Sequence, residues 1–149
     1  MQVVWQRLPL VLAALWWGAL SGLSFVAVPM AFAYFGNPAV AGPFAAKLFQ
    51  FQAWMSVVVP LLLVLWGRLQ RMSSAEVTAR WVLLPWLLLA ALAALLQEHA
   101  VAERILTARG NGGNLRLWHG VGTGLMLVQW LCALRVLWWF GRRADAPSL

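Results

Sequence analysis

The two histidines of this sequence, His99 and His119, are the side chains suited to the largest number of chemical roles. Histidines on neighbouring helices can ligate a single metal ion or the iron of a haem. Neither histidine belongs to an HxxxH or ExxH motif, and the single cysteine, Cys132, lies in an apolar segment. We therefore expect His119 to hydrogen-bond a neighbouring helix and His99 to lie at an interface, with no cofactor. Haem or metal binding through His119 and His99 is the alternative.

Polar and charged side chains gather near the same ends of three predicted helices. This outer polar cluster consists of Lys47, Gln50, Glu98, His99, Arg116 and His119. Charged side chains are costly within lipid, so they usually face other helices or pair with an opposite charge. We therefore predict an ion pair between Lys47 and Glu98. We also predict that His119 points into the bundle, where Gln50, Glu98 or His99 bonds it.

The sequence lacks the motifs of the common catalytic sites. It contains no phosphate-binding loop, no metalloprotease motif and no Ser/His/Asp set at a recognisable spacing. A proton relay needs titratable groups across the membrane, and no Asp or Glu falls at mid-depth of a predicted helix. We therefore expect a protein without enzymatic activity.

The amino-acid composition and the apolar segments of the sequence predict the helices that carry these residues. Only 10% of the 149 residues are charged, whereas a soluble domain carries roughly a quarter. This excludes an ordinary soluble domain, and the 63% of hydrophobic residues excludes disorder. About 20 apolar residues span the hydrocarbon as a helix, and the apolar segments predict helices near 8–35, 44–66, 81–98 and 116–140. We predict an all-α, polytopic membrane protein, a four-transmembrane-helix bundle forming one domain over residues 1–149.

Prolines and glycines mark where these helices bend and end. Pro29 falls late in the first apolar segment and should kink this helix or end its regular part. The segment is about twice as long as the apolar region of a signal peptide, so we expect it to be retained as a span. Residues 36–43 and 110–113 are rich in turn-forming residues and predict loops. Residues 73–76 have the sequence of a helix-capping box.

Basic residues predict the orientation of the four helices. An even number of spans places both termini on one side, which carries six basic residues: Arg7, Arg68, Arg71, Arg80, Arg142 and Arg143. The other side carries four: Lys47, Arg104, Arg109 and Arg116. Because cytoplasmic loops are enriched in Lys and Arg, we predict that both termini are cytoplasmic. We interpret the net charge of +7 as orientation charge and contact with lipid headgroups, not as nucleic-acid binding.

Two pairs of glycines have the spacing of close helix contacts. Gly18 and Gly22 lie four residues apart in the first predicted helix, and Gly120 and Gly124 do so in the fourth. Small residues at this spacing let two helix backbones approach closely. We predict that the first and fourth helices touch through one of these pairs inside the bundle. The alternative is that the glycines form a face between two copies of the chain.

Three short segments carry a resemblance to a known family. They are Phe25–Phe32, Ala41-Gly42 with Leu48-Phe49, and Trp118-His119-Gly120. In this order they resemble the bacterial branch of the transmembrane protein 205-like family, whose members are small four-helix membrane proteins with a domain of unknown function. The resemblance implies a four-span membrane protein and supplies no established catalytic residue. Where the family often has Ser and Asn after the histidine, this chain has Gly122 and Met126.

These observations lead to three hypotheses about function. The first is a non-enzymatic inner-membrane protein that acts as a scaffold, an accessory subunit or a transport-related component. The second is a haem- or metal-binding membrane protein that uses His119 and His99. The third is a small permease that works as an oligomer. The expected partners are membrane lipids, together with a second copy of the chain or another membrane protein, and no nucleic acid.

Overall fold

The computed structural model describes residues 2–69 and 81–144, and within these ranges it contains helices and no strand. The first span consists of α1 (Gln2–Gly22), a short π-helix η1 (Leu23–Ala27) and α2 (Val28–Phe35), and the second is α3 (Pro38–Leu69). The third consists of α5 (Leu84–Leu96), a second π-helix η2 (Gln97–Val101) and α6 (Ala102–Asn111), and the fourth is α7 (Leu115–Ala144). The predicted all-α class is confirmed.

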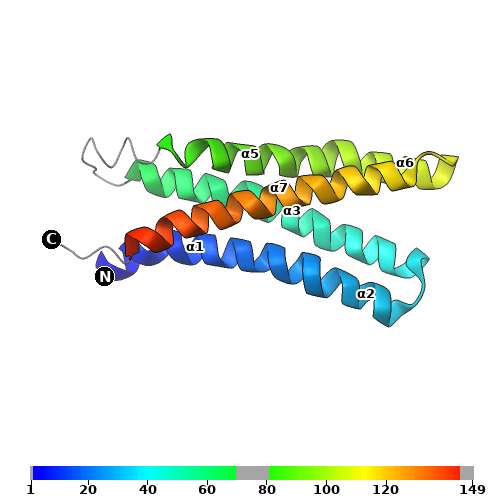
Figure 1. Ribbon diagram of the computed structural model, residues 1–149, viewed down its shortest axis with the longest axis horizontal. Coiled ribbons are helices and arrows are strands. Elements are labelled where there is room, and N and C mark those ends of the chain that lie inside the picture. Colours follow the sequence, from blue (N-terminus) through cyan, green and yellow to red (C-terminus); the bar gives the residue numbers. More distant parts are fainter. Residues whose placement is uncertain (1, 70–80, 145–149) are drawn as a thin grey trace.

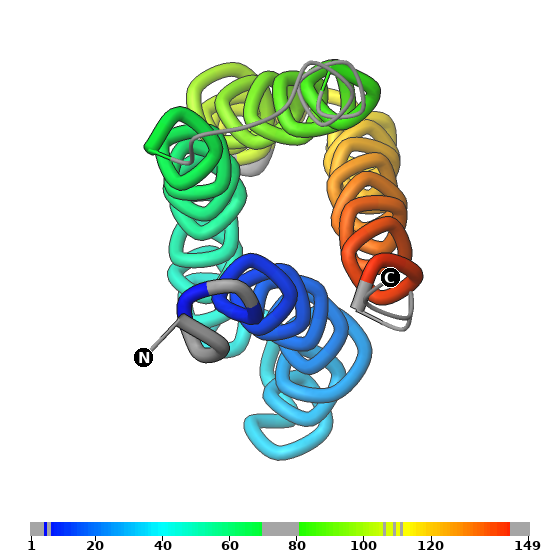
Figure 2. The backbone as a smooth tube through the Cα atoms, turned by 90° about the vertical axis from the view of Figure 1, so that its left-hand side faces the viewer, coloured from blue at the N-terminus to red at the C-terminus, as the bar shows by residue number. Residues whose placement is uncertain are grey.

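The four long helices form a bundle. α1 contacts α3 and α7, and α5 also contacts α3 and α7, so the helices lie around a common axis (Figure 2). Both described ends of the chain lie at one end of the bundle, here called the terminal end (Figure 1). The turns after α2 and α6 lie at the opposite end, here called the distal end. Each long helix has a segment that is long and apolar enough to cross a membrane.

The first turn is much shorter than the predicted loop over residues 36–43. Gly36 ends α2 with a positive φ of 60°, and α3 begins directly at Pro38. The Asn37 side chain accepts a hydrogen bond of 2.9 Å from the backbone N–H of Ala39, which caps the new helix. Proline is favoured in the first helical turn, because its missing N–H has no partner there. These two signals place the helix start at Pro38, six residues before the predicted start at residue 44.

The third span continues as a helix beyond its predicted end at residue 98. The π-helix η2 and then α6 carry it to Asn111, where Gly112 ends it with a φ of 70°. The predicted loop is therefore confined to the residues around Gly112 and Gly113, and Asn114 caps α7 by accepting a hydrogen bond from the Leu117 backbone. The predicted capping box at residues 73–76 lies outside the described residues.

The predicted distortion near Pro29 is present just before the proline. In an α-helix the proline ring crowds the carbonyl of the residue four positions earlier, which here is Phe25. Phe25 lies within η1, where the wider π-helical turn relieves this crowding. The helix then resumes as α2 at Val28, so the regular α-helix is interrupted before Pro29 but the span continues past it.

The apolar core occupies the terminal half of the bundle. Its largest fully buried side chain is Trp16 of α1, which packs with residues of α3, α5 and α7 such as Val59, Leu87 and Val136. On the outside of the bundle, many large apolar side chains are exposed, including Leu15 at 62%. An apolar surface of this extent is normal only when lipid covers it.

The distal half of the bundle is divided into two parts. There α2 packs on α3, while α6 packs on α7 and continues from η2. Figure 1 shows α2 and α6 on opposite sides of the distal end. This division matters for the site, because the polar side chains described below lie where the four helices begin to separate.

Candidate functional site: a buried polar layer

One uncharged polar residue from each span lies in the same layer of the bundle. These residues, here called the polar layer, are Ser24 of η1, Gln52 of α3, Gln97 of η2 and Gln129 of α7. The three glutamine side chains are 1%, 8% and 0% exposed, respectively. Buried amides are costly in an apolar interior unless they form hydrogen bonds, so their contacts decide what the layer can do.

Two sets of contacts connect the polar layer across the helices. The Ser24 hydroxyl lies 3.2 Å from Gln52 Oε1 and 3.1 Å from Met126 Sδ, and its single proton serves one of these acceptors at a time. On the other side, Gln129 Nε2 donates a hydrogen bond of 2.8 Å to Gln97 Oε1. The same nitrogen lies 3.3 Å from the carbonyl oxygen of Leu125 in its own helix. The layer therefore links all four spans.

Two atoms of the polar layer have no hydrogen-bond partner among the described residues. They are Gln52 Nε2, which is a donor, and Gln129 Oε1, which is an acceptor. Leaving a buried polar group unpaired costs about 1–3 kcal/mol. Each of these atoms can be satisfied by a small neutral molecule that both accepts and donates hydrogen bonds, of which water is the smallest example.

Both π-helices contribute to the polar layer. Ser24 lies in η1 and Gln97 lies in η2. A π-helical turn adds a residue to the ordinary spacing, so it rotates the following side chains relative to those before it. Such turns are frequent at functional sites. Here each of them turns a polar residue of an otherwise apolar helix toward its neighbours.

The two residues with unpaired atoms are deep within their spans. Gln129 lies at the centre of the segment Leu115–Arg143, with 14 residues on each side, and Gln52 has 14 residues before it and 17 after it in the segment Pro38–Leu69. At 1.5 Å per residue, both lie about 21 Å or more from either end of their helices. Gln97 is closer to the distal end, with eight residues after it in the segment Leu84–Ile105.

A second set of hydrogen bonds anchors α1 next to the polar layer. Trp130 Nε1 of α7 donates to Ser21 Oγ at 2.8 Å, and Ser21 Oγ donates in turn to the Trp17 carbonyl at 2.9 Å. The rings of Trp17 and Trp130 are 5.5 Å apart between centroids. The residue before Trp17 bonds the other neighbour: Trp16 Nε1 donates to Ser56 Oγ of α3 at 3.1 Å. These contacts hold α1 against both neighbours.

Sequence reasoning did not single out the polar layer. Its signal is weak, because one serine or glutamine in a long apolar segment is common and carries no motif. The informative pattern is that each of the four apolar helices contains an uncharged polar residue at a matching depth. That comparison needs the helix boundaries and the π-helical turns, which only the structure supplies.

The outer polar cluster is only partly brought together. Lys47 Nζ donates to Gln50 Oε1 at 3.2 Å, and Gln50 Nε2 donates to Glu98 Oε1 at 2.7 Å. The amide of Gln50 thus lies between the two charges, and the predicted direct ion pair between Lys47 and Glu98 is wrong for the described structure. Arg116 is exposed and does not join this chain of hydrogen bonds.

His119 does not point into the bundle as predicted. Its side chain is exposed, and its imidazole forms no hydrogen bond with a described residue. The reason is helix rotation: α7 turns Gln129 and Val136 inward, and this rotation leaves the His119 side chain exposed. His99 is exposed beside α3. Within the described ranges, no group of three His, Cys, Asp or Glu residues is placed to hold a metal ion.

The glycine pairs do not make the predicted contact inside the bundle. A Cβ atom added at Gly18, Gly22, Gly120 or Gly124 meets nothing within 4 Å. α1 and α7 do touch, but through larger side chains such as Trp17 and Trp130. Within α7, Gly122 is close to the third span, because an added Cβ there would lie 3.4 Å from Val101. The alternative of a face between two copies stays a prediction.

The fold and the polar layer define a class of protein, a four-helix bundle with the features of a multi-pass membrane protein and a polar layer inside. Within this class, the chain belongs to the family described as "Domain of unknown function (DUF4149)", whose model matches residues 11–114. The match contains Ser24, Gln52 and Gln97 and stops before α7. Searches of curated proteins and of solved structures found no match to this chain.

Proposed function

We propose that this protein is a non-enzymatic, transport-related component of the membrane that binds a small, uncharged, hydrogen-bonding solute in the polar layer. The observation that carries the proposal is the unpaired donor Gln52 Nε2 together with the unpaired acceptor Gln129 Oε1, both buried. A neutral solute that accepts from one amide and donates to the other removes the cost of both unpaired atoms.

The chemistry of the layer favours an uncharged solute. Its four residues carry one hydroxyl and three amides, and none of them can neutralise an ion. An ion without a counter-charge is strongly disfavoured in an apolar interior. Passage past the core in the terminal half requires a movement of the helices, which an oligomer of the chain can provide.

Solute flux into proteoliposomes tests this proposal. We expect the purified protein to raise the flux of water, urea or glycerol several-fold over empty liposomes in a stopped-flow measurement. The double variant Gln52→Met/Gln129→Met keeps the side-chain volumes but removes both unpaired atoms, so it should reduce the flux to the level of empty liposomes. Thr123→Val is the matched control, because Thr123 is exposed and bonds only its own helix at the His119 carbonyl.

Cys132 provides the test that these variants are folded. It is 1% exposed, so its thiol should resist a membrane-permeant maleimide in the native protein and react after denaturation. If the double variant is labelled without denaturant, it is not folded. The single variant Ser24→Ala is then used in its place in the flux measurement. Equal flux in wild type and a folded variant, or no flux above empty liposomes for any of the three solutes, would contradict the proposal.

We also propose that the protein lies in the bacterial inner membrane with the terminal end in the cytoplasm. The distribution of basic residues supports this orientation. With an impermeant maleimide added to spheroplasts, Thr107→Cys at the distal end should be labelled and Leu69→Cys at the terminal end should not. Both positions are exposed, and the buried Cys132 gives the background. Labelling of Leu69→Cys but not of Thr107→Cys would show that the orientation is opposite to the one we propose.

We further propose that the family of this chain is related to the transmembrane protein 205-like family. The segment Phe25–Phe32 supports this, because it falls inside the matched range and contains parts of η1 and α2. Trp118-His119-Gly120 lies outside that range. The relation predicts that a structure of a transmembrane protein 205-like member has a π-helical turn at the position of η1, and a regular α-helix there would argue against it.

A further inference from the structure

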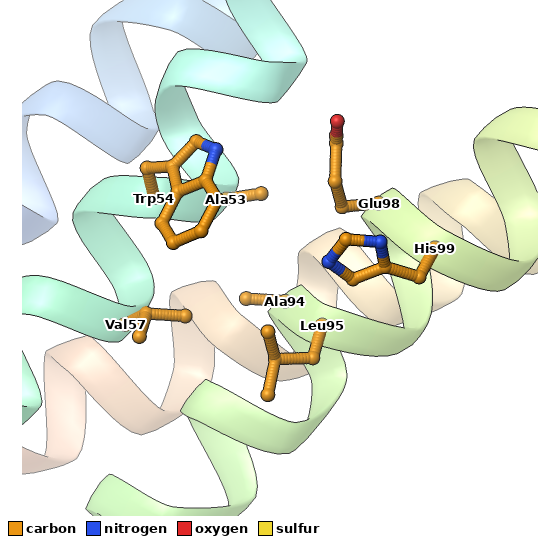
Figure 3. A pocket seen from close by; sticks show the side chains of 7 residues that line it. All are labelled: Ala53, Trp54, Val57, Ala94, Leu95, Glu98 and His99. Atoms are coloured by element: carbon orange, nitrogen blue, oxygen red, sulfur yellow. The ribbon is translucent and has the colours of Figure 1, made fainter.

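A shallow pocket lies on the outer side of the contact between α3 and the third span (Figure 3). Its lining includes Ala53 and Ala94, which are almost fully buried, so the two helices are close together here. Trp54 and Leu95 also line it and are exposed, so the pocket opens to the lipid-facing surface of the bundle. Its volume of about 10 Å³ holds one group of the size of a water molecule or a hydroxyl.

The pocket combines an aromatic face, a carboxylate and an imidazole. In Figure 3 the indole of Trp54 and the imidazole of His99 face one another across the pocket, and Glu98 extends beside them. The His99 imidazole forms no hydrogen bond with a described residue. The Glu98 carboxylate accepts one hydrogen bond, from Gln50 at 2.7 Å, and a carboxylate can accept several. Both side chains therefore have hydrogen-bonding capacity for a ligand.

The depth of the pocket in the membrane excludes a phospholipid headgroup as its occupant. Trp54 lies 12 residues before Trp66 in α3, or about 18 Å along the helix. Glu98 lies 17 residues after Trp81 in the third span, or about 26 Å. The hydrocarbon is about 30 Å thick, and tryptophans mark its interface. With Trp66 and Trp81 at one interface, the pocket lies inside the hydrocarbon and reaches almost to the opposite interface.

A ligand that comes from the hydrocarbon is expected to be uncharged, because an ion there is strongly disfavoured. The pocket also does not need a cation, since Gln50 already connects Glu98 to Lys47 through hydrogen bonds of 2.7 and 3.2 Å. The neutral group that suits a carboxylate is a hydroxyl, whose O–H···O⁻ hydrogen bond is short and strong. The same hydroxyl oxygen can accept a hydrogen bond from the imidazole of His99.

The exposed indole of Trp54 favours a ligand in which this hydroxyl is attached to an aromatic ring. Trp54 is 51% exposed, and the pocket is too small to hold a ring. With its hydroxyl in the pocket, a planar ring lies in the opening and packs against the exposed part of the indole, as aromatic pairs do. A chain alcohol fills the same pocket but does not make this contact.

The surface beside the pocket suits an apolar tail on this ring. Leu61 lies seven residues after Trp54, or about 10 Å along α3 toward the terminal end, and is 55% exposed. Leu92 of α5 lies three residues before Leu95 on the same side of the pocket and is also exposed. The order of hydroxyl, ring and tail then runs from the distal interface toward the middle of the hydrocarbon.

We propose that the pocket between α3 and the third span binds a lipid-soluble hydroquinone in its reduced form. One hydroxyl lies between Glu98 and His99, the ring packs on Trp54, and the apolar tail follows Leu61. This site is separate from the polar layer, and the proposal does not depend on the solute proposed there. It assigns a binding role to Glu98 and His99, which the polar layer does not use.

Native mass spectrometry of the detergent-purified protein, incubated separately with four compounds, tests this site. We expect decylubiquinol to be retained, with one molecule per chain. Decylubiquinone and the dimethyl ether of decylubiquinol keep the ring and the tail but lack the hydroxyl protons, so each should be retained at least about ten-fold less. Dioctanoylglycerol offers a hydroxyl without a ring and should also be retained at least about ten-fold less.

Substitutions in the pocket test the two contacts separately. Glu98→Gln keeps an oxygen that accepts from Gln50 but removes the charge, so it should lower decylubiquinol retention about ten-fold. Trp54→Leu should weaken retention, and Trp54→Phe should restore most of it. The matched controls are Glu103→Gln in α6 and Trp138→Leu in α7, which change an exposed carboxylate and an exposed indole away from the pocket. Both should retain decylubiquinol like wild type.

Three results would each overturn the proposal. The first is equal retention of decylubiquinol, decylubiquinone and the dimethyl ether by the wild-type protein, which would show that the hydroxyl protons are not recognised. The second is retention of dioctanoylglycerol as strong as that of decylubiquinol, which would show that the ring is not recognised. The third is unchanged retention of decylubiquinol by Glu98→Gln. The first two comparisons use only the wild-type protein, so they do not depend on how a variant folds.

Discussion

Replacing Trp16 with alanine should lower the free energy of unfolding by about 3–5 kcal/mol, the largest effect we expect from a single substitution. The side chain is 0% exposed and is the largest of the fully buried ones. Its removal leaves a cavity between α1 and its neighbours and takes away the partner of Ser56, which Trp16 Nε1 reaches at 3.1 Å. In lipid, where apolar groups gain little from leaving the solvent, such packing contacts hold helices together.

The rate of Cys132 labelling under increasing detergent denaturation measures this effect, because the thiol is buried in the same core. Leu15→Ala is the control: Leu15 precedes Trp16 but is 62% exposed, so its truncation should leave the labelling curve nearly unchanged. Similar curves for the two variants would show that the core does not depend on Trp16. Ser56→Ala should have a smaller effect, since it removes the hydrogen bond and leaves the indole packing in place.

The sequence is sufficient to predict the class of fold. Four long apolar segments allow only helices that satisfy their own backbone hydrogen bonds in lipid, and short connections between them favour an antiparallel bundle. The boundaries are harder to predict, because they depend on local contacts. Asn37 and Pro38 start α3 inside the predicted loop, and η2 carries the third helix past Glu98 without a break.

The candidate site depends on helix rotation, which the sequence specifies poorly for apolar helices. In a soluble protein the polar face of a helix marks the outside, but here both lipid and core are apolar, so the periodicity is weak. The prediction for His119 assumed that a polar residue must turn inward, yet its side chain is exposed. The glycine pairs show the same difficulty: their spacing permits a close contact but does not say with which surface.

Exchanging both Gln97 and Gln129 for leucine should give a bundle at least as stable as either single variant, although two hydrogen-bonding groups are lost. Gln129 Nε2 donates to Gln97 Oε1 at 2.8 Å, and both side chains are buried. Each single change leaves the other amide without this partner, at a cost of about 1–2 kcal/mol. The double change removes both amides and also the unpaired Gln129 Oε1. The expected coupling free energy between the two positions is about 1 kcal/mol.

A double-mutant cycle followed by the same Cys132 labelling measures this coupling. Additive losses, with the double variant the least stable of the four proteins, would show that the two amides act separately. If the double variant instead regains stability and loses solute flux, the amides are not present to hold the bundle together. A pair of leucines would serve that purpose better in lipid, so this outcome would support the solute binding that we propose for the amide pair and its unpaired acceptor.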